Sequence, residues 1–531
     1  MEPIVEDLLQ PSSWPVPTRR VELVQTHISW VLLGDADVFK LKRPVSYGFL
    51  DFRTTAARLA ACEAEVRLNA RLAPGVYRGV VPVVLDAHRR HRLGGPGETV
   101  DHAVHMRRLP DAVRADHKLA LQQLGTGEVD RIARRLAAFH ALCPSDDRIA
   151  DFGTVPAITG NVRENFAQTR GGLDRWLTPA EAAEVEASQL AFLHERAALF
   201  AARIAAGRVR DGHGDLRLEH VYLPPESEVL ILDCIEFNER FRYADTAADL
   251  AFLSMDLALH GRVDLAERLL SEYARSADDF DLYPLVDFYE SYRAFVRGKV
   301  LSFLACDAAA QPADRARADQ AARRYFLLSL AAERRSLLPA SLVAVGGSLA
   351  AGKTTLADRL SLELSAPIIE SDRTRKALLD VPAGASAGRS PWQGAYDPAV
   401  TAWVYAEMLR RAAAVLESGR PVILDASFRS REQRARARAL AVQAGVPFRF
   451  VECRAPSAVR RARLQARESA SYTGASDART ALLDDFDSRF EPATDLRPEE
   501  HLPVDTAVGS IEEQMAELRA FLATWPVGLR G

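Results

Sequence analysis

A glycine-rich stretch between an apolar run and a helical pattern has the residue types and spacing for binding phosphate groups. It reads Gly-Ser-Leu-Ala-Ala-Gly-Lys-Thr over residues 347–354 and follows the apolar residues 342–345. Glycines at both ends let the backbone approach phosphate oxygens closely, while amide groups and a helix N-terminus point at the anion. Lys353 is expected to reach the terminal phosphates of ATP, and the Thr354 hydroxyl to bind Mg²⁺. The residues expected to contact the nucleotide are Gly347, Ser348, Leu349, Ala350, Ala351, Gly352, Lys353, Thr354 and Thr355.

Two acidic residues end apolar runs that follow the glycine-rich stretch. Asp372 ends the run 367–372, and Asp425 ends the run 421–425. Ligands of open α/β sheets gather at the carboxyl ends of the strands, so both carboxylates are expected near the nucleotide. Asp372 is predicted to be the base that activates an acceptor hydroxyl, with helix capping as its alternative role. Asp425 is predicted to bind Mg²⁺.

A helical pattern over residues 459–469 is rich in arginine. Arg463 and Arg467 are expected on one face of this helix, because residues four apart are neighbours on a helix surface. Such a face is suited to gripping a transferring phosphoryl group from a closing lid, and a solvated basic face is the alternative. Arg375, shortly after Asp372, is a further candidate for clamping the acceptor.

The N-terminal half offers a lysine and a glutamate for a second nucleotide site. Lys40 lies in a strand pattern and Glu65 in the helical pattern that follows it, with Lys42 and Glu63 as second choices. In kinases a strand lysine grips the nucleotide phosphates and pairs with a helix glutamate. Taken alone, these residues also fit a solvated strand edge and a solvated helix face.

A later loop and strand carry a resemblance to a known family. His-Gly-Asp-Leu at residues 213–216, followed by an apolar run ending in Ile-Leu-Asp, resembles the aminoglycoside phosphotransferase and choline kinase branch of the protein-kinase-like fold. The resemblance implies that Asp215 orients or deprotonates a substrate hydroxyl and that Asp233 binds metal. It also implies that Asp249 braces the loop that carries Asp215 rather than acting chemically.

The sequence departs from that family at His220. Those families usually have an asparagine at this position to hold metal, and imidazole is a poor match for oxygen-loving Mg²⁺. His220 is kept as a candidate metal ligand, and Glu236 is a residue that could compensate. The departure leaves two readings of the N-terminal half open: an active enzyme and a binding module.

The C-terminal half resembles the small P-loop kinases of the zeta toxin, chloramphenicol phosphotransferase, gluconate kinase and polynucleotide kinase group. The likeness rests on the phosphate loop, Ser371-Asp372, the segment Leu-Asp-Ala-Ser-Phe at 424–428 and the arginine-rich helix. It implies a kinase whose acceptor ranges over sugars, antibiotics and nucleic-acid ends. The pairing of the two halves resembles bacterial proteins described as bifunctional aminoglycoside phosphotransferase/ATP-binding proteins.

The elements that must position these residues predict two domains. Strand patterns between residues 21 and 109, with one helix over 54–72, predict a small antiparallel sheet, and a mostly helical region follows it as far as residue 336. Pro339 marks a domain boundary before the strand that leads into the phosphate loop. The predicted fold class is therefore α/β, with a protein-kinase-like α+β domain over residues 1–337 and a P-loop NTPase domain with a mainly parallel sheet over residues 338–531.

Composition excludes several classes of protein. The 531 residues are 48% hydrophobic and 26% charged, as in globular proteins, and the net charge of −4 gives no whole-molecule attraction to nucleic acid or an anionic membrane. The five cysteines are scattered and form no Cys-x-x-Cys pair, which argues against a disulfide framework and a zinc site. With no apolar stretch of membrane-spanning length, we expect a cytoplasmic protein.

Together these features predict an ATP- and Mg²⁺-dependent phosphotransferase that acts on a hydroxyl group of a small molecule. The phosphate-loop domain is the expected main active site, and the kinase-like domain is a second phosphotransferase or a substrate-binding module. One alternative is a nucleotide-dependent switch with a catalytically silent kinase-like domain. Another is a kinase of nucleic-acid ends, which the acidic net charge disfavours. The sequence specifies neither the acceptor nor the oligomeric state.

Overall fold

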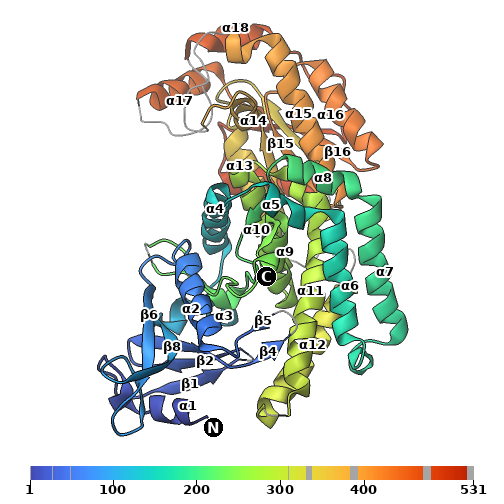
Figure 1. Ribbon diagram of the computed structural model, residues 1–531. Coiled ribbons are helices and arrows are strands. Elements are labelled where there is room, and N and C mark those ends of the chain that lie inside the picture. Colours follow the sequence, from blue (N-terminus) through green and yellow to red (C-terminus); the bar gives the residue numbers. More distant parts are fainter. Residues whose placement is uncertain are drawn as a thin grey trace. The chain divides into compact units, whose positions relative to one another are not determined.

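The computed structural model describes residues 2–26, 28–47, 50–225, 227–308, 310–330, 338–382, 393–469 and 480–522 (Figure 1). The chain forms two compact units, one of Met1–Gly261 with Phe288–Ala332 and one of Arg262–Asp287 with Glu333–Gly531. The end of the expected helical region, at residues 331–336, lies outside the described ranges.

An antiparallel sheet begins the first unit, as predicted. Its strand order is β1-β2-β3-β8-β6-β7, and helix α2 (Thr55–Asn69) packs on β8 and β6. Alternation along β3 places Phe39 and Leu41 in the core on one face and turns Lys40 and Lys42 toward α2. The strands are β1 (Glu22–Gln25), β2 (Ser29–Leu33), β3 (Asp37–Lys42), β6 (Tyr77–Leu85), β7 (His91–Leu93) and β8 (Glu98–Arg107).

Two short antiparallel pairs frame the loop that carries Asp215. Strand β9 (Val209–Asp211) pairs with β12 (Tyr243–Asp245), and β10 (Val221–Tyr222) pairs with β11 (Leu230–Ile231). The strand expected over 229–233 is thus only two residues long, because the chain leaves the ladder before Asp233.

Helices make up most of the rest of the first unit, which also contains the short antiparallel pair of β4 (Ser46–Tyr47) with β5 (Leu50–Asp51). Helices α6 and α7 lie side by side (Figure 1), and the aromatic-rich stretch of α11 belongs to the core, with Phe288, Tyr289 and Phe295 buried. These helices include α4 (Thr126–Leu142), α6 (Val155–Thr169), α7 (Pro179–Glu195), α8 (Ala197–Ala205), α9 (Thr246–Leu259), α11 (Tyr283–Cys306) and α12 (Pro312–Ser329).

The second unit is built on a five-stranded parallel sheet with the order β14-β15-β13-β16-β17. Its strands are β13 (Leu342–Gly347), β14 (Ile368–Glu370), β15 (Val422–Asp425), β16 (Phe448–Arg454) and β17 (His501–Asp505). Its helices include α13 (Lys353–Leu364), α14 (Ser371–Leu378), α15 (Pro398–Glu417), α16 (Arg431–Gln443), α17 (Ser457–Ser469), α18 (Leu483–Ser488) and α19 (Ile511–Leu522). The predicted fold class, an antiparallel α+β unit followed by a parallel P-loop unit, is confirmed.

Helix α10 (Val263–Ala277) packs within the phosphate-loop unit, although it precedes the predicted boundary by many residues. The Ser271 hydroxyl donates to the Ala366 carbonyl at 3.1 Å, and Arg275 forms ion pairs with Glu370 and Asp358 at 2.9 and 3.0 Å. The boundary between residues 337 and 338 stays a prediction, but the contacts of residues 262–287 assign this segment to the second unit.

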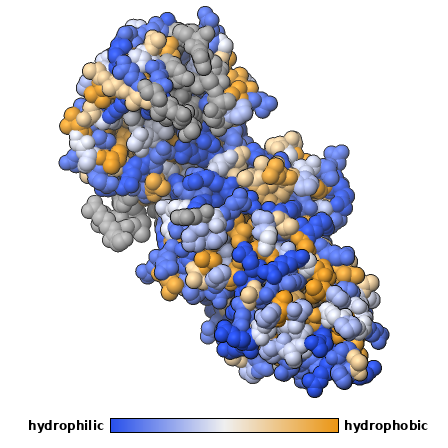
Figure 2. Space-filling model, turned by 90° about the vertical axis from the view of Figure 1, so that its left-hand side faces the viewer, coloured by the Kyte–Doolittle hydropathy of each residue, from blue (hydrophilic) through white to orange (hydrophobic). Residues whose placement is uncertain are grey.

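Among the helices of the described ranges, none is both long and apolar enough to cross a membrane. On the face drawn in Figure 2, hydrophobic residues form small groups among hydrophilic ones.

Candidate active sites

The phosphate loop adopts a conformation that its glycines permit. Gly347 and Gly352 have φ values of 131° and 91°, and a Cβ atom on Gly347 would lie 2.3 Å from the Cys453 carbonyl oxygen. Lys353 begins helix α13, and its Nζ donates a hydrogen bond to the Ser348 carbonyl at 2.8 Å. The lysine therefore reaches back over the loop whose amides are expected to receive phosphate.

Thr354 and Asp425, the two residues expected to bind Mg²⁺, lie together. The Thr354 hydroxyl donates to Asp425 Oδ2 at 2.7 Å, and the Asp425 side chain is buried at the end of β15. Burial raises the pKa of Asp425 to about 7, although the nearby Lys353 ammonium acts in the opposite direction. A hydroxyl and a carboxylate are oxygen ligands of the kind Mg²⁺ prefers, so this pair fits the ion.

Asp372 lies two residues after the end of β14, in the first turn of α14. The N-cap of this helix is Glu370, so the alternative role of Asp372 as a helix cap does not apply. Burial lowers the pKa of Lys353, and the charges of Asp425 and Asp372 oppose that effect, which puts both carboxylates in the electrostatic environment of the lysine. The role of Asp372 as a base stays a prediction.

The arginine-rich helix contacts the phosphate loop through Arg460 and Arg463. Arg460 donates to Ser348 Oγ at 2.8 Å and forms an ion pair with Asp487 at 2.6 Å, and Ser348 also bonds to Asp487. Sequence reasoning missed Asp487 because it lies 139 residues after Ser348 and belongs to no recognisable pattern.

The two preferred arginines of that helix differ in their surroundings. Arg463 donates to the Ala350 carbonyl at 3.1 Å and to the Thr506 carbonyl at 2.7 Å, so it holds the loop backbone to the end of β17. The Arg467 charge helps to lower the pKa of Lys353. Contact of either arginine with a transferring phosphoryl group stays a prediction.

Arg375, considered for the acceptor, is buried in protein contacts. Its guanidinium donates to the Ala395 carbonyl at 2.7 Å and lies 4.6 Å from the centre of the Tyr396 ring. This arginine holds the segment before α15 instead of facing open space.

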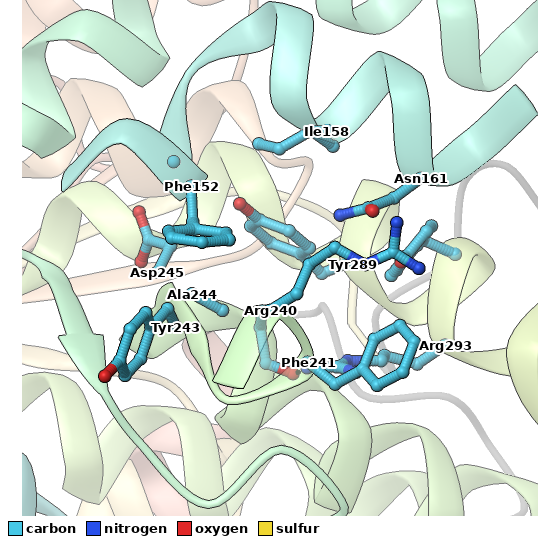
Figure 3. A pocket seen from close by; sticks show the side chains of 13 residues that line it. Phe152, Ile158, Asn161, Arg240, Phe241, Tyr243, Ala244, Asp245, Tyr289 and Arg293 are labelled. Carbon is cyan, nitrogen blue, oxygen red and sulfur yellow. Dashed lines mark hydrogen bonds between the residues drawn. The ribbon is translucent and has the colours of Figure 1, made fainter. Parts of the chain in front are cut away.

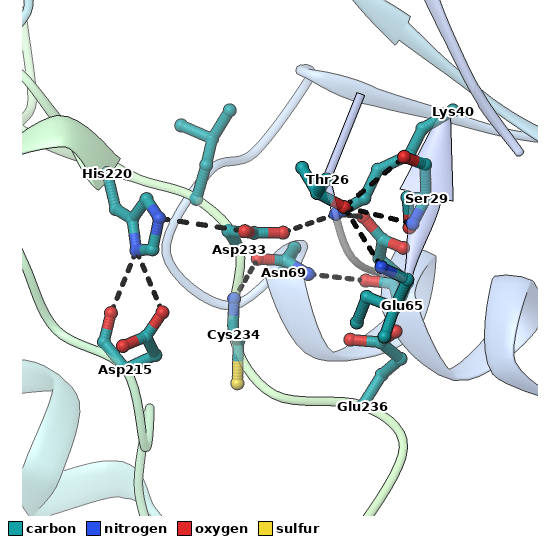
Figure 4. Close-up of polar contacts among 12 residues, drawn as sticks. Thr26, Ser29, Lys40, Glu65, Asn69, Asp215, His220, Asp233, Cys234 and Glu236 are labelled. Carbon is teal, nitrogen blue, oxygen red and sulfur yellow. Dashed lines mark hydrogen bonds and ion pairs between the residues drawn. The ribbon is translucent and has the colours of Figure 1, made fainter. Parts of the chain in front are cut away.

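The predicted pairing of Lys40 with Glu65 in the first unit is confirmed (Figure 4). Lys40 Nζ lies 3.0 Å from Glu65 Oε1 and also bonds to Asp233. Lys42, the second choice, contacts the other oxygen of Glu65 at 2.5 Å and bonds to Glu236. Glu236 is therefore the partner of a buried lysine, and the two lysines share one glutamate.

Asp233 is held in a left-handed backbone conformation, with φ of 64°. The next amide, of Cys234, donates to Asn69 Oδ1 at 2.9 Å, and Asn69 Nδ2 donates to the Glu65 carbonyl at 2.9 Å. Helix α2 thus fixes both Glu65 and the turn that presents Asp233 (Figure 4).

Asp215 is engaged by an arginine that sequence reasoning missed. Arg217 donates to both Asp215 oxygens, at 3.0 and 2.9 Å. Although burial acts in the opposite direction, the Arg217 charge holds the pKa of Asp215 below its usual range. An ionised, arginine-bound carboxylate can orient a hydroxyl group but is a weak base.

Both ring nitrogens of His220 are engaged within the loop. Nδ1 faces the Asp215 carbonyl at 2.8 Å and must donate to it, so Nε2 accepts from Arg217 at 3.0 Å. Burial lowers the pKa of His220 to about 4, which keeps the ring neutral. Asp233 Oδ2 is 3.6 Å from His220 Nε2. The lone pair of Nε2 already accepts the hydrogen bond from Arg217, so this nitrogen could bind a metal ion only if Arg217 moved away. Metal binding by His220 therefore stays a prediction.

Asp249 braces the loop, as expected. Its carboxylate accepts hydrogen bonds from the backbone amides of His213 at 2.6 Å and Gly214 at 2.8 Å. We expect Asp249→Ala to destabilise the first unit by about 3 kcal/mol, because two buried amides lose a charged acceptor. Urea unfolding followed by tryptophan fluorescence measures this, since Trp14, Trp30 and Trp176 are buried in the same unit.

The matched control for Asp249 is Asp111→Ala, which removes an exposed carboxylate that pairs with Arg114. Its loss is expected to cost less than about 1 kcal/mol. Equal destabilisation by both substitutions would contradict a bracing role for Asp249.

Comparisons with known proteins agree with this architecture. Residues 342–493 match the family described as AAA domain. The uncharacterized protein Rv2004c of Mycobacterium tuberculosis (strain ATCC 25618 / H37Rv) is 34% identical over 464 residues, which cover 87% of this chain and 89% of that protein. The chain belongs to the same family as this mycobacterial protein. The uncharacterized protein Mb2027c of Mycobacterium bovis (strain ATCC BAA-935 / AF2122/97) matches the present chain with the same identity and coverage.

Solved structures similar to parts of the chain include two kinases by description. A putative kinase from Chloroflexus aurantiacus is 25% identical, with a TM-score of 0.28, and the match covers 34% of this chain and 98% of that one. A choline/ethanolamine kinase family protein from Mesorhizobium loti is 14% identical, with a TM-score of 0.34, over 59% of this chain and 92% of that one.

Proposed function

We propose that this protein is an ATP-dependent phosphotransferase that moves the γ-phosphoryl group to a hydroxyl group of a small molecule at the phosphate loop of the second unit. The observation that carries this proposal is the Thr354–Asp425 pair, 2.7 Å apart, beside a loop whose lysine reaches back over it. A loop that binds phosphate and a buried oxygen pair that suits Mg²⁺ are what nucleotide phosphates require. The AAA-domain match over residues 342–493 also supports nucleotide binding.

Each residue has a distinct role in the proposed reaction. The loop amides and Lys353 hold the phosphates, and Thr354 and Asp425 hold Mg²⁺. When bound, Mg²⁺ would neutralise charge on the phosphate oxygens. Asp372 accepts the proton of the acceptor hydroxyl while the oxygen of that hydroxyl forms a bond to the γ-phosphorus of ATP. The bond between the γ-phosphorus and the oxygen that bridges it to the β-phosphorus breaks, and ADP leaves. Arg467 adds positive charge near Lys353.

The first unit is proposed to be a second phosphotransferase or a substrate-binding module. The Lys40–Glu65 ion pair, with Asp233 on the same lysine, supports a nucleotide site there. The Arg217 clamp on Asp215 favours orientation of a hydroxyl over removal of its proton. Binding of an acceptor is therefore the role that this geometry supports better.

The experiment that tests the proposal measures Mg²⁺-dependent ADP release by the full chain with pooled aminoglycosides, sugars, nucleosides and oligonucleotides. Wild type is compared with Lys353→Ala and Asp215→Ala. Acceptor-stimulated release that is lost only in Lys353→Ala supports the second unit as the enzyme. Loss only in Asp215→Ala would assign the reaction to the first unit. Absence of stimulation by every acceptor would overturn the proposal in favour of a nucleotide-dependent switch, and stimulation by oligonucleotides alone would favour a nucleic-acid end kinase.

A further inference from the structure

A pocket in the first unit has polar groups that the proposed reaction does not use (Figure 3). It has a volume of about 40 Å³ and is lined from η3 (Asp151–Gly153), α6, η6 (Glu239–Phe241), β12, α9 and α11. Because a water molecule needs about 10–15 Å³ on this scale, the pocket admits a group of a few non-hydrogen atoms. Its aromatic wall includes Phe152 and Tyr243, whose rings meet edge to face at 5.3 Å.

Arg293 is a buried cation at this pocket. Arg293 is only 6% exposed, and its Nε donates a hydrogen bond to the Ala248 carbonyl at 3.3 Å. The guanidinium lies over the rings of Phe252 and Tyr292, at 5.0 and 5.8 Å. Among the residues that the structure describes, no carboxylate lies within ion-pair distance of it. Although burial acts in the opposite direction, the Arg293 charge helps, with His140, to lower the pKa of Asp249, so this carboxylate is a counter-charge at longer range. Burying a guanidinium without a hydrogen-bonded carboxylate is unfavourable, so Arg293 can accept an anionic ligand.

Two neutral polar groups face the same space. Tyr289 is 4% exposed, and neither its hydroxyl nor the Asn161 amide has a hydrogen-bond partner in the described part of the chain. Figure 3 shows the Tyr289 hydroxyl directed into the pocket below Ile158, with the Asn161 amide on the adjoining wall. Burial raises the pKa of Tyr289, so its hydroxyl keeps its proton and can donate it in a hydrogen bond.

The other charges at the pocket are already paired. Arg203 donates to both oxygens of Asp245, at 2.8 and 2.6 Å, and Arg240 donates to Glu164 at 2.7 Å. Arg293 is therefore the lining cation that forms no ion pair in the described part of the chain, and the nearby Asp249 charge acts on it without ion-pair contact.

We propose that this pocket binds a small oxyanion, the carboxylate or phosphate group of a small molecule, with Arg293 as its counter-ion. A guanidinium can donate two parallel hydrogen bonds to two oxygens of such a group, and Tyr289 and Asn161 supply further donors. The positive charge disfavours a cationic ligand, and the small volume limits the bound part to the anionic group itself.

Binding of acetate to the full chain, measured by calorimetry, tests this proposal. Wild type is expected to bind acetate at one saturable site, and Arg293→Gln to bind it about tenfold more weakly or worse. Tyr289→Phe keeps the ring and is expected to weaken binding by about fivefold, since it removes one hydrogen bond. Acetamide, the neutral isostere of acetate, is expected not to bind.

A second arm uses inorganic phosphate in the Lys353→Ala background, because the phosphate loop itself is expected to bind phosphate. Binding of acetate alone identifies a carboxylate site, binding of phosphate alone a phosphate site, and binding of both a general oxyanion site. Arg324→Gln is the control, because this exposed arginine of α12 bonds only to the Leu259 carbonyl among described residues and should leave binding unchanged.

Two results would overturn the proposal. One is the absence of saturable binding of either anion to wild type, and the other is equal affinity of wild type and Arg293→Gln. If Arg293→Gln does not fold, Tyr289→Phe decides instead, and an unchanged affinity in that variant would assign the anion to another site. None of these outcomes depends on the phosphotransferase activity.

Discussion

Replacing Lys353 with alanine is expected to slow acceptor-stimulated transfer by about 10²–10³-fold, the loss typical of removing one preorganised charge or donor from a transition state. Lys353 begins α13, and its ammonium lies over the phosphate loop, bonded to the Ser348 carbonyl at 2.8 Å. No other side chain in the described part of this loop carries a positive charge, so alanine removes the positive charge that the loop itself offers to the terminal phosphates. Single-turnover transfer from labelled ATP measures the effect.

Two control variants distinguish the loss of the Lys353 charge from a general disturbance of helix α13. Lys353→Arg keeps the charge but replaces a compact ammonium with a larger planar group, so a partial loss is expected. Arg359→Ala changes an exposed residue of the same helix that pairs with Glu512, and wild-type transfer is expected. A transfer rate in Lys353→Ala close to that of wild type would remove the phosphate loop from the reaction.

Replacing Glu267 with glutamine is expected to destabilise the phosphate-loop unit by about 3 kcal/mol, because it removes a partner from a buried charge. Arg420 is 1% exposed, with Glu267 at 2.9 Å and Asp287 at 2.8 Å as its carboxylate partners. An arginine cannot lose its proton to escape the cost of burial. Hydrogen exchange of the β13 and β15 amides measures the change in the unit concerned.

The matched control is Glu512→Gln, which removes the partner of the exposed Arg359 and should cost less than about 1 kcal/mol. Equal protection of the β13 and β15 amides in the two variants would show that Arg420 does not depend on α10.

The contacts of residues 262–287 also predict the stability of a fragment that starts at residue 338. Such a fragment lacks the partners of Arg420 and also Arg275, the partner of Glu370, so it should be less stable than one that includes residues 262–287.

The sequence predicted the parts of the sites that depend on local pattern. The phosphate loop follows one buried strand and Asp425 ends another. Parallel strands bring their carboxyl ends to one edge of a sheet, which is why Thr354 and Asp425 meet. Lys40 and Glu65 could be paired in advance because the strand and helix that carry them are close in the chain.

Contacts between distant segments could not be predicted in this way. Asp487 meets Ser348 and Arg460 only through the packing of α18, and Arg217 looks like an ordinary loop residue until its side chain is seen on Asp215. The same applies to α10, whose helical pattern does not reveal which unit it packs against. A pattern shows what an element is, whereas its partner depends on tertiary packing.

The measurement that tests the central claim most directly is ATP affinity with and without Mg²⁺ in wild type, Thr354→Val, Asp425→Asn and Asp233→Asn. If the Thr354–Asp425 pair holds the ion, we expect Mg²⁺ to strengthen ATP binding in wild type by about tenfold or more, because the Asp425 carboxylate and the Thr354 hydroxyl both provide oxygen ligands for it. That gain should disappear in Thr354→Val and Asp425→Asn, with metal-free affinity retained, and persist in Asp233→Asn. A gain that persists in the first two variants and disappears only in Asp233→Asn would contradict the account and assign the Mg²⁺-dependent site to the first unit.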